Sequence, residues 1–200
     1  YDRDSMIMGW SAPEILAKEI SEFRKFSDPR LKILDLGIGT GQLSAIFRRQ
    51  NPESHITGID VSRKMLACCE RKNLADVLQG GNIDEALCDF PDESFDIVMS
   101  SGVFEFLENA DQVIAQIARI LKPGGVCAFT GYSDSICDYN GVQPDINYEP
   151  ALKKAHLQLN RDFRFLAYYW GHEYNDDRAI YYRTYVAEKP QRGFCIPDFT

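Results

Sequence analysis

The chain has 200 residues, of which 44% are hydrophobic and 26% are charged, and its formal net charge is -8. This length suits one α/β domain with a sizeable core and excludes two such domains. The acidic balance argues against a nucleic-acid partner, because proteins that grip phosphates usually display a basic patch. No apolar run approaches the roughly 18 residues of a membrane helix, and the first residues lack a signal-peptide pattern. We therefore expect a cytoplasmic protein with no membrane partner.

The first thirty residues predict one helix that follows a short apolar stretch. Ser11 is a good helix cap, Pro13 suits the first turn, and Asp28 with the following proline ends the helix. The residues at helical spacing between them are Ile15, Leu16, Glu19, Ile20 and Phe23. Residues 1–10 include Trp10 and have no core strand to join. They form either a frayed or docked terminus or a flap over the cofactor or substrate.

A strand, a tight turn and a helix start follow one another between residues 32 and 50. Residues 32–36 form a short apolar run typical of a buried parallel strand. Gly37, Gly39 and Gly41, here called the glycine turn, let the backbone reverse sharply and pass close to a ligand. The predicted helix 42–50 then points its free N–H groups toward that ligand. This layout is typical of a nucleotide-type cofactor site.

The spacing of the glycines and one acidic residue distinguish a dinucleotide site from a site for another nucleotide-type cofactor. The dinucleotide pattern G-x-G-x-x-G, begun at Gly37, needs a glycine at position 42, where this chain has Gln42. Asp35 at the end of the strand suits a cationic group and would repel a pyrophosphate. S-adenosylmethionine (SAM) carries an ammonium and a sulfonium and has no phosphate. Asp60, which ends the predicted strand 55–60, can accept the two ribose hydroxyls of an adenosine.

The rest of the first 130 residues alternates strand and helix. The predicted elements are helix 62–71, strand 76–79, strand 95–100, helix 110–121 and strand 126–130. This alternation predicts a parallel sheet with helices on both faces and a ligand site beyond the carboxyl ends of the strands. Beyond it, residues 131–150 predict an irregular segment and residues 151–159 a helix. Residues 163–174 and 179–188 then predict a β-hairpin.

Four blocks of sequence resemble the class I SAM-dependent methyltransferases, of the methyltransferase domain 11/25 kind. They are L-D-L-G-I-G-T-G, G-I-D-V-S-R-K-M-L, F-D-I-V-M-S-S-G-V-F-E-F-L and R-I-L-K-P-G-G, within residues 31–130. The W-x-A-P at Trp10 and the tail from Tyr148 more loosely resemble methyltransferases related to the Williams-Beuren region product. The resemblance implies one domain over residues 1–200, with a Rossmann-like seven-stranded mixed sheet, helices on both faces and a last antiparallel hairpin. Residues 1–30 would form the N-terminal helix and possible flap, 31–130 the cofactor-binding core, and 131–200 the substrate side with the hairpin.

The resemblance also implies the residues that bind SAM and release S-adenosylhomocysteine. Asp60 would hold the ribose, because Ser62 can cap the next helix and leaves Asp60 free. Met65 would pack against the adenine or, equally well, in the core. Asn82 stands where the family has an acid for the adenine amino group, and its amide oxygen can accept that bond, although Asp84 competes for the role. The full predicted set is Asp35, Gly37, Gly39, Gly41, Asp60, Val61, Met65, Asn82, Ile83, Ser100, Ser101 and Val103.

Glu105 is the one candidate catalytic residue, because it follows the fourth strand where the family places substrate-facing residues. It would act as a general base or as an acceptor for a substrate amine. The alternative is a structural acid in the first turn of a helix. A sulfonium methyl is already electrophilic, so alignment of the nucleophile and exclusion of water can suffice for transfer.

Aromatic residues outside the four blocks could line an acceptor pocket or simply pack the hairpin. They are Trp10, Tyr132, Tyr139, Tyr168, Tyr169 and Trp170. The leading hypothesis is a methyltransferase for a small-molecule acceptor, acting as a monomer or homodimer. The alternatives are a protein or tRNA methyltransferase that works with a partner, a non-catalytic SAM-binding scaffold, and a dehydrogenase. The six cysteines have no C-x-x-C or histidine partner, so we expect free thiols and no metal.

Overall fold

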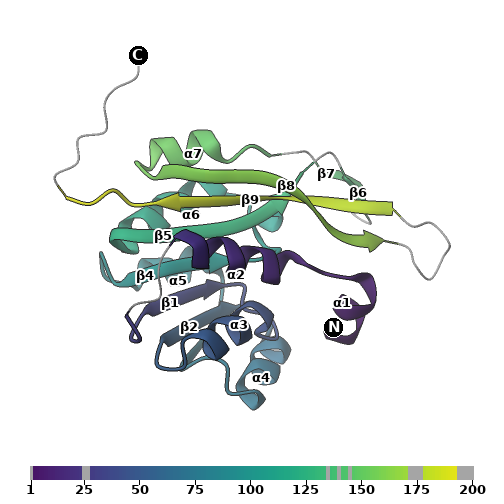
Figure 1. Cartoon of the computed structure of the whole chain (residues 1–200), viewed down its shortest axis with the longest axis horizontal. Coiled ribbons are helices and arrows are strands. Elements are labelled where there is room, and N and C mark those ends of the chain that lie inside the picture. Colours follow the sequence, from purple (N-terminus) through teal and green to yellow (C-terminus); the bar gives the residue numbers. More distant parts are fainter. Residues whose placement is uncertain are drawn as a thin grey trace.

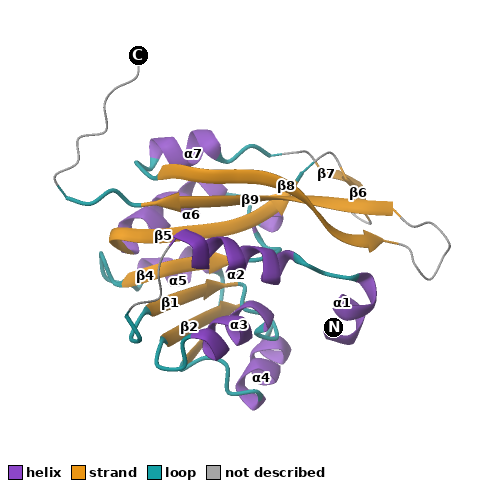
Figure 2. Cartoon of the chain, in the orientation of Figure 1, coloured by secondary structure: helices purple, strands orange, loops and turns teal. Residues whose placement is uncertain are grey.

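The computed structural model describes residues 2–23, 28–133, 136–138, 141–143, 146–170 and 178–192. Its centre is a seven-stranded mixed sheet with the strand order β3-β2-β1-β4-β5-β9-β8. In Figure 1 the sheet extends from β2 near the bottom to β8 near the top, and Figure 2 shows the helices packed around it. The predicted architecture is confirmed, including the antiparallel hairpin that closes the sheet.

The strands β1 to β5 run parallel to one another, and β9 runs antiparallel to both β5 and β8. Their bounds are β1 Lys32–Leu36, β2 His55–Asp60, β3 Val77–Gly80, β4 Phe95–Ser100, β5 Leu121–Tyr132, β8 Gln158–Trp170 and β9 Arg178–Glu188. A separate two-stranded sheet joins β6 Ile136–Asp138 to β7 Gly141–Gln143.

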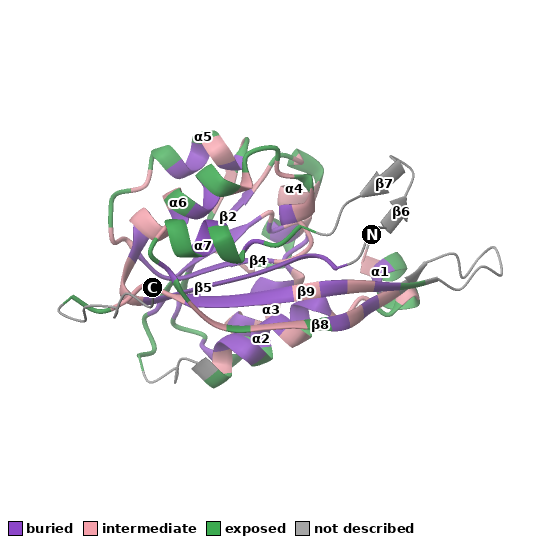
Figure 3. Cartoon of the chain, turned by 90° about the horizontal axis from the view of Figure 1, so that it is seen from above, coloured by how far each residue is buried: buried purple, intermediate pink, exposed green. Residues whose placement is uncertain are grey.

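The helices cover the two faces of the sheet. Their bounds are α1 Asp2–Met8, α2 Ala12–Phe23, α3 Gln42–Gln50, α4 Arg63–Arg71, α5 Ile83–Cys88, the 3-10 helix η1 Phe104–Phe106, α6 Ala110–Ile120 and α7 Glu149–Lys154. Figure 3 shows α5, α6 and α7 above the sheet and α2 and α3 below it. No helix in the described ranges is long and apolar enough to cross a membrane.

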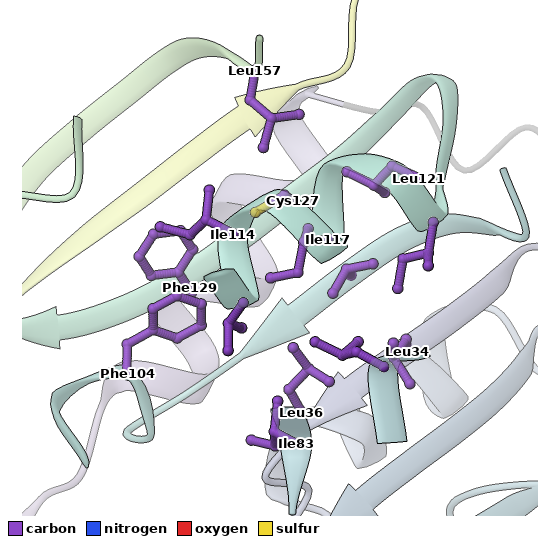
Figure 4. Close-up of a cluster of buried hydrophobic side chains, with 14 of the residues drawn as sticks. Leu34, Leu36, Ile83, Phe104, Ile114, Ile117, Leu121, Cys127, Phe129 and Leu157 are labelled. Carbon is purple, nitrogen blue, oxygen red and sulfur yellow. The ribbon is translucent and has the colours of Figure 1, made fainter. Parts of the chain in front are cut away.

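Alternation along β1 explains why both faces are covered. Leu34 and Leu36 join the core under α6, whereas Ile33 faces the opposite core under α2 and α3. Figure 4 shows Leu34 and Leu36 in the first of these cores with Ile114 and Ile117 of α6. Full burial of each such side chain stabilises the fold by about 1.5–3 kcal/mol. This double-sided burial fixes the carboxyl end of β1, where the glycine turn begins.

Two predicted elements have wrong or incomplete bounds. The predicted helix 151–159 is a short helix, α7, after which β8 already begins at residue 158. The pairing of β8 with β9 overrides the helical pattern there, and His156 takes a left-handed φ of 57° between the two elements. The strand predicted for 126–130 begins at Leu121, with a register irregularity opposite β4. The sequence also gave no indication of α1 or α5.

The N-terminal stretch is docked in this structure. Asp2 of α1 accepts hydrogen bonds from Thr40 Oγ1 and from Lys72 Nζ, the latter at 2.6 Å. Ser11 directly precedes α2, as predicted for a cap, but its hydroxyl donates to the Leu166 carbonyl of β8 at 2.9 Å. Met6 is 82% exposed, so α1 is held mainly by polar contacts at its start. The flap interpretation stays a prediction.

Candidate active site

The glycine turn joins the end of β1 to the start of α3. Its three glycines, Gly37, Gly39 and Gly41, all have left-handed φ values, between 55° and 85°. A Cβ on Gly37 would lie 2.3 Å from Val103 Cγ2, whereas a Cβ on Gly39 would meet nothing nearer than 3.9 Å. Gly37 is therefore required by packing, and Gly39 leaves backbone open beside the cavity. Gly41 is also packed, since a Cβ there would lie 2.7 Å from the Leu74 side chain.

Asp60 links the end of β2 to the glycine turn. Its Oδ2 accepts the Gly39 N–H and its Oδ1 accepts the Ser62 N–H, both at 2.8 Å. Ser62 is the N-cap of α4, as predicted, and its hydroxyl accepts the Met65 N–H at 3.4 Å, while Asp60 orders the entry to this helix through the Ser62 N–H. A carboxylate has about four lone-pair sites, so each oxygen can still accept a ribose hydroxyl. The acid is placed for both tasks.

The residues predicted for the adenine lie at the ends of β2 and β3. Val61 is 72% exposed, which is unusual for a branched apolar side chain and leaves it available to a flat ring. Met65 is half-buried and Asn82 is exposed. Asn82 takes the N-cap position of α5 without a side-chain capping bond. The Ile83 side chain is buried in the core, but its N–H opens α5 and has no intrahelical acceptor.

A cavity lies between the glycine turn and the N-terminal stretch. Its lining residues are Trp10, Pro13, Asp35, Gly37, Ile38, Gly39, Thr40, Gln42, Leu43 and Ser101. Asp35 is only 2% exposed, and its Oδ2 accepts a 2.6 Å hydrogen bond from Ser44 Oγ. Burial, with a smaller contribution from the charge of Asp60, raises the pKa of Asp35 to about 7, although the hydrogen bonds from Ser44 oppose the rise. An ammonium beside Asp35 would offset this burial.

The residues at the end of β4 divide between packing and cavity. Ser100 Oγ donates to the Leu36 carbonyl at 2.8 Å and so fastens β4 to β1. Val103 packs on Gly37. Ser101 lines the cavity, and its buried hydroxyl has no hydrogen-bond partner among the described residues. Ser101 is therefore the residue of this group with a polar atom to offer a ligand, whereas direct contact by Ser100 and Val103 stays a prediction.

Glu105 lies in η1, beside the cavity wall formed by Trp10. Its Oε1 accepts a 2.6 Å hydrogen bond from the hydroxyl of Tyr182 on β9. Its Oε2 is buried and has no hydrogen-bond partner in the part of the chain that the structure describes. Burial raises the pKa of Glu105 to about 7, although the bond from Tyr182 opposes the rise. A carboxyl with this pKa can hold or release a proton near neutral pH.

Aromatic rings gather around this acid. Trp10 contacts Tyr168 and Tyr182 edge to face, with ring centroids 5.6 and 5.1 Å apart, and Tyr132 contacts Tyr182 at 5.1 Å. Sequence reasoning proposed Trp10, Tyr132 and Tyr168 for this region but missed Tyr182. The alternation of buried residues along β9 is the signal that could have found it. Tyr139 and the side chains of Tyr169 and Trp170 lie outside the described residues.

The sequence also predicts that the chain has no metal site. No group of three or more histidine, cysteine, aspartate or glutamate side chains in the described ranges could hold a metal ion. His55 lies at the start of β2, where its Nδ1 is 3.8 Å from Asp76 Oδ2, and His156 lies between α7 and β8. Neither side chain lines the cavity. His172 is outside the described residues.

Comparison with known proteins shows which family the core of the chain resembles. Residues 34–129 match the model of a family described as a methyltransferase domain. The chain is 35% identical over 109 residues to the ubiquinone/menaquinone biosynthesis C-methyltransferase UbiE of Desulfotalea psychrophila, a match that covers 52% of this chain and 42% of that relative. It is 32% identical over 142 residues to a malonyl-acyl-carrier-protein O-methyltransferase of a Paenibacillus species, covering 66% and 50%. The chain thus spans about half the length of the curated relatives it matches.

A solved structure shows how far the fold extends. The crystal structure of the cyclase SpnF superimposes with a TM-score of 0.69, at 19% identity, over 89% of this chain and 82% of that chain. At this identity the likeness shows the fold alone, and a cyclase on this fold illustrates that fold does not fix chemistry. The four sequence blocks, the sheet order and the family match together identify residues 34–129 as a domain of the class I SAM-dependent methyltransferase family.

The residues at the cavity fit SAM. Asp35 is a buried acid without a cationic partner among the groups that shift its pKa, and it suits the ammonium of the cofactor. Ser101 adds an unpaired buried hydroxyl, and Gly39 adds open backbone. Asp60 suits the ribose, and the exposed Val61 suits the adenine. No element of the site calls for a phosphate.

Proposed function

We propose that this chain transfers the sulfonium methyl of SAM to a nucleophilic nitrogen, oxygen, sulfur or carbon atom of a small molecule, leaving S-adenosylhomocysteine. The observation that carries the proposal is the buried Asp35 beside the open backbone of Gly39 at the carboxyl end of β1. A dinucleotide site would have a bare helix N-terminus there, without a buried acid to repel the pyrophosphate.

When bound, SAM supplies a methyl group that is already electrophilic, so the chain itself has little bond chemistry to perform. Asp35 pairs with the ammonium of the cofactor and Asp60 binds its ribose, and Ser101 offers a buried hydroxyl that has no hydrogen-bond partner among the described residues. Trp10 lines the cavity on the N-terminal side, where a bound cofactor would leave less room for water. Positioning and exclusion of water are together sufficient to account for methyl transfer.

The acceptor side favours a small molecule over a macromolecule. Trp10, Tyr132 and Tyr182 pack against one another, and Tyr132 and Tyr182 are 7% and 3% exposed. An enclosed cluster of this kind suits a small ligand that buries most of its surface. The net charge of -8 gives no general attraction for tRNA.

Two measurements test the proposal. Isothermal titration calorimetry should show binding of SAM and S-adenosylhomocysteine by the wild-type chain and no binding of NAD. Incubation with methyl-labelled SAM and a cell extract, followed by size separation, should place the label in the low-molecular-weight fraction. Asp60→Ala should weaken the binding of SAM. Glu53→Ala, which removes an exposed acid that does not line the cavity, is its control and should bind SAM as the wild type does.

Each other result favours a different function. Label in the protein or RNA fraction supports the macromolecular alternative, with a partner that completes the acceptor site. Tight SAM binding without label in any fraction supports a non-catalytic scaffold. Binding of NAD without binding of SAM supports a dehydrogenase and contradicts the proposal altogether.

A further inference from the structure

The feature that the cofactor does not explain is the buried carboxyl of Glu105. Its Oε2 is sealed from solvent and has no hydrogen-bond partner among the described residues, whereas its Oε1 accepts the Tyr182 hydroxyl and the carboxylate also interacts with the backbone N–H of Glu105 itself. The groups that shift its pKa include no lysine or arginine. A buried carboxylate normally has a cation or several hydrogen-bond donors, because burial of an unpaired charge is costly. A missing partner is therefore expected at Oε2.

The position of Glu105 is next to the cavity that the cofactor fits. A Cβ built on Gly102 would lie 3.1 Å from Trp10 Cζ2 and 3.9 Å from Glu105 Oε1. The Trp10 ring and the Glu105 carboxylate thus flank the same point of the backbone. Trp10 also lines the cofactor cavity together with Ser101, which directly precedes Gly102. The Glu105 carboxylate therefore lies behind the Trp10 and Ser101 wall of the cavity and is not itself one of the lining residues.

The described side chains that surround Glu105 are aromatic, and no lysine or arginine is among the groups that shift its pKa. Trp10 and Tyr182 contact each other at 5.1 Å, and Tyr132 extends the group on the other side of Tyr182. Phe106 contacts Tyr132 at 6.4 Å and is 63% exposed, so it marks the solvent side of the group. Aromatic faces attract cations, and they do so more strongly where water is excluded. A neutral alcohol would satisfy the hydrogen bond at Oε2 but would leave the carboxylate charge unpaired.

We propose that the methyl acceptor is a small protonated amine, whose ammonium group binds between the Glu105 carboxylate and the rings of Trp10 and Tyr182. This inference rests on the proposed methyltransferase function and specifies its substrate class. It assigns Glu105 two tasks, which are to pair with the ammonium and to accept its proton.

The transfer balances with these two tasks. The Glu105 carboxylate accepts one proton from the ammonium, which frees the lone pair of the nitrogen. That lone pair forms the new N–CH3 bond as the C–S bond of the sulfonium breaks, and the sulfur keeps the electron pair of the broken bond. Glu105 then passes its proton to solvent, so each turnover releases one proton in total. No oxidant, reductant or metal is needed.

The groups that face Glu105 from neighbouring elements stay neutral during this step. They include the hydroxyls of Tyr182 on β9 and of Tyr148 before α7, and the indole of Trp10. Burial and the charge of Glu105 both raise the pKa of Tyr148 and of Tyr182 above the usual value. Glu105 itself, with a pKa of about 7, is the group that titrates near neutral pH.

A binding experiment tests the substrate class without knowledge of the natural acceptor. The protein is first saturated with S-adenosylhomocysteine and is then titrated at pH 7.5 with benzylamine, phenethylamine, benzyl alcohol and 2-phenylethanol. We expect each amine to bind at least about tenfold more tightly than the alcohol of the same shape. Glu105→Gln, which keeps the shape of the side chain, should abolish that preference. Glu108→Gln, which removes an exposed acid three residues away, should retain it.

The outcomes separate this inference from the proposed function. Failure to bind S-adenosylhomocysteine would contradict the proposed function itself. Normal binding of S-adenosylhomocysteine would leave that function intact, and equal affinities for amines and alcohols, or no binding of either amine, would then overturn the amine assignment. Preference for amines that persists in Glu105→Gln would also overturn it. Tyr182→Phe, which keeps the ring and loses one hydrogen bond, should keep a reduced preference.

A second readout follows the product. The low-molecular-weight product labelled from SAM should bind a cation exchanger at acidic pH and should resist mild base, as a methylated amine does. A labelled product that hydrolyses in mild base is an ester, and one that passes through the exchanger is neutral or acidic. Either of these products would overturn the amine assignment while confirming methyl transfer to a small molecule.

Discussion

The cofactor end of the site, which is the cavity, and the proposed acceptor end, which is the aromatic cluster around Glu105, are held together by different kinds of contact. At the cofactor end, backbone groups of Gly39 and Ser62 bind the Asp60 carboxylate, and neighbouring strands fix every part. At the acceptor end, side chains from α1's flank, η1 and β9 meet, and the central bond joins Glu105 to Tyr182, 77 residues apart. Substitutions at the first end should therefore disturb both folding and cofactor binding. Substitutions at the second end should act mainly on acceptor binding.

The largest expected effect comes from Gly37→Ala. The new Cβ would lie 2.3 Å from Val103 Cγ2 at a φ of 69°. Overpacking and left-handed strain together should lower the free energy of unfolding by about 2–4 kcal/mol. Gly39→Ala has open space and should cost only about 1 kcal/mol of stability while it weakens SAM binding. Urea unfolding and calorimetry of both variants measure the contrast, and equal stability losses would contradict it.

Asp60→Ala should have the next largest effect. It removes the acceptor of two backbone N–H groups as well as the predicted ribose ligand. We expect SAM affinity to fall at least about 100-fold and the thermal midpoint to fall as well, because charged hydrogen bonds contribute about 1.5–3 kcal/mol each. Calorimetry and thermal unfolding measure the two losses. Unchanged SAM affinity would remove Asp60 from the ribose role.

Asn82→Ala should have a smaller effect, confined to binding. Its side chain makes no capping bond, so stability should change little. Loss of one neutral hydrogen bond should weaken SAM binding by roughly 2- to 10-fold. Asp84→Ala is the matched variant and should weaken binding less. If Asp84→Ala weakens binding more, calorimetry would transfer the adenine role to that acid.

The smallest expected effect is a change in the pH dependence of stability. Burial raises the pKa of Glu105 from 4.5 to about 7, so the folded state holds the proton more tightly than the unfolded state does. The resulting stability is fully present below pH 4.5 and is lost as the pH rises through 7. Glu105→Gln should therefore lose less stability than the wild type between pH 5 and 8, and its SAM affinity should stay within about twofold. Thermal unfolding measures this dependence of stability on pH. Glu108→Gln should show the same dependence as the wild type. If Glu105→Gln also shows the wild-type dependence, Glu105 is ionised over the whole range from pH 5 to 8.

The same contrast explains what the sequence could predict. The bounds of β1, α3, β2 and β4 were predicted to the residue, because strand burial and glycine spacing are local signals. The start of β8 was missed because its pairing with β9 outweighs the local helical pattern. Glu105 was proposed from its place after β4, but the Tyr182 hydroxyl that binds it depends on the register of β9. Neither the bond nor the unpaired Oε2 could be derived before the sheet was assembled.

Trp10 belongs to both regions, since it lines the cofactor cavity and also flanks Glu105 in the proposed acceptor region. One side chain that contacts two ligands makes their affinities interdependent. If a bound cofactor raises the affinity for the acceptor by fixing the indole, a bound acceptor raises the affinity for the cofactor by the same factor, because the coupling free energy is reciprocal. The order in which the two ligands arrive then affects the rates and leaves the final equilibrium unchanged.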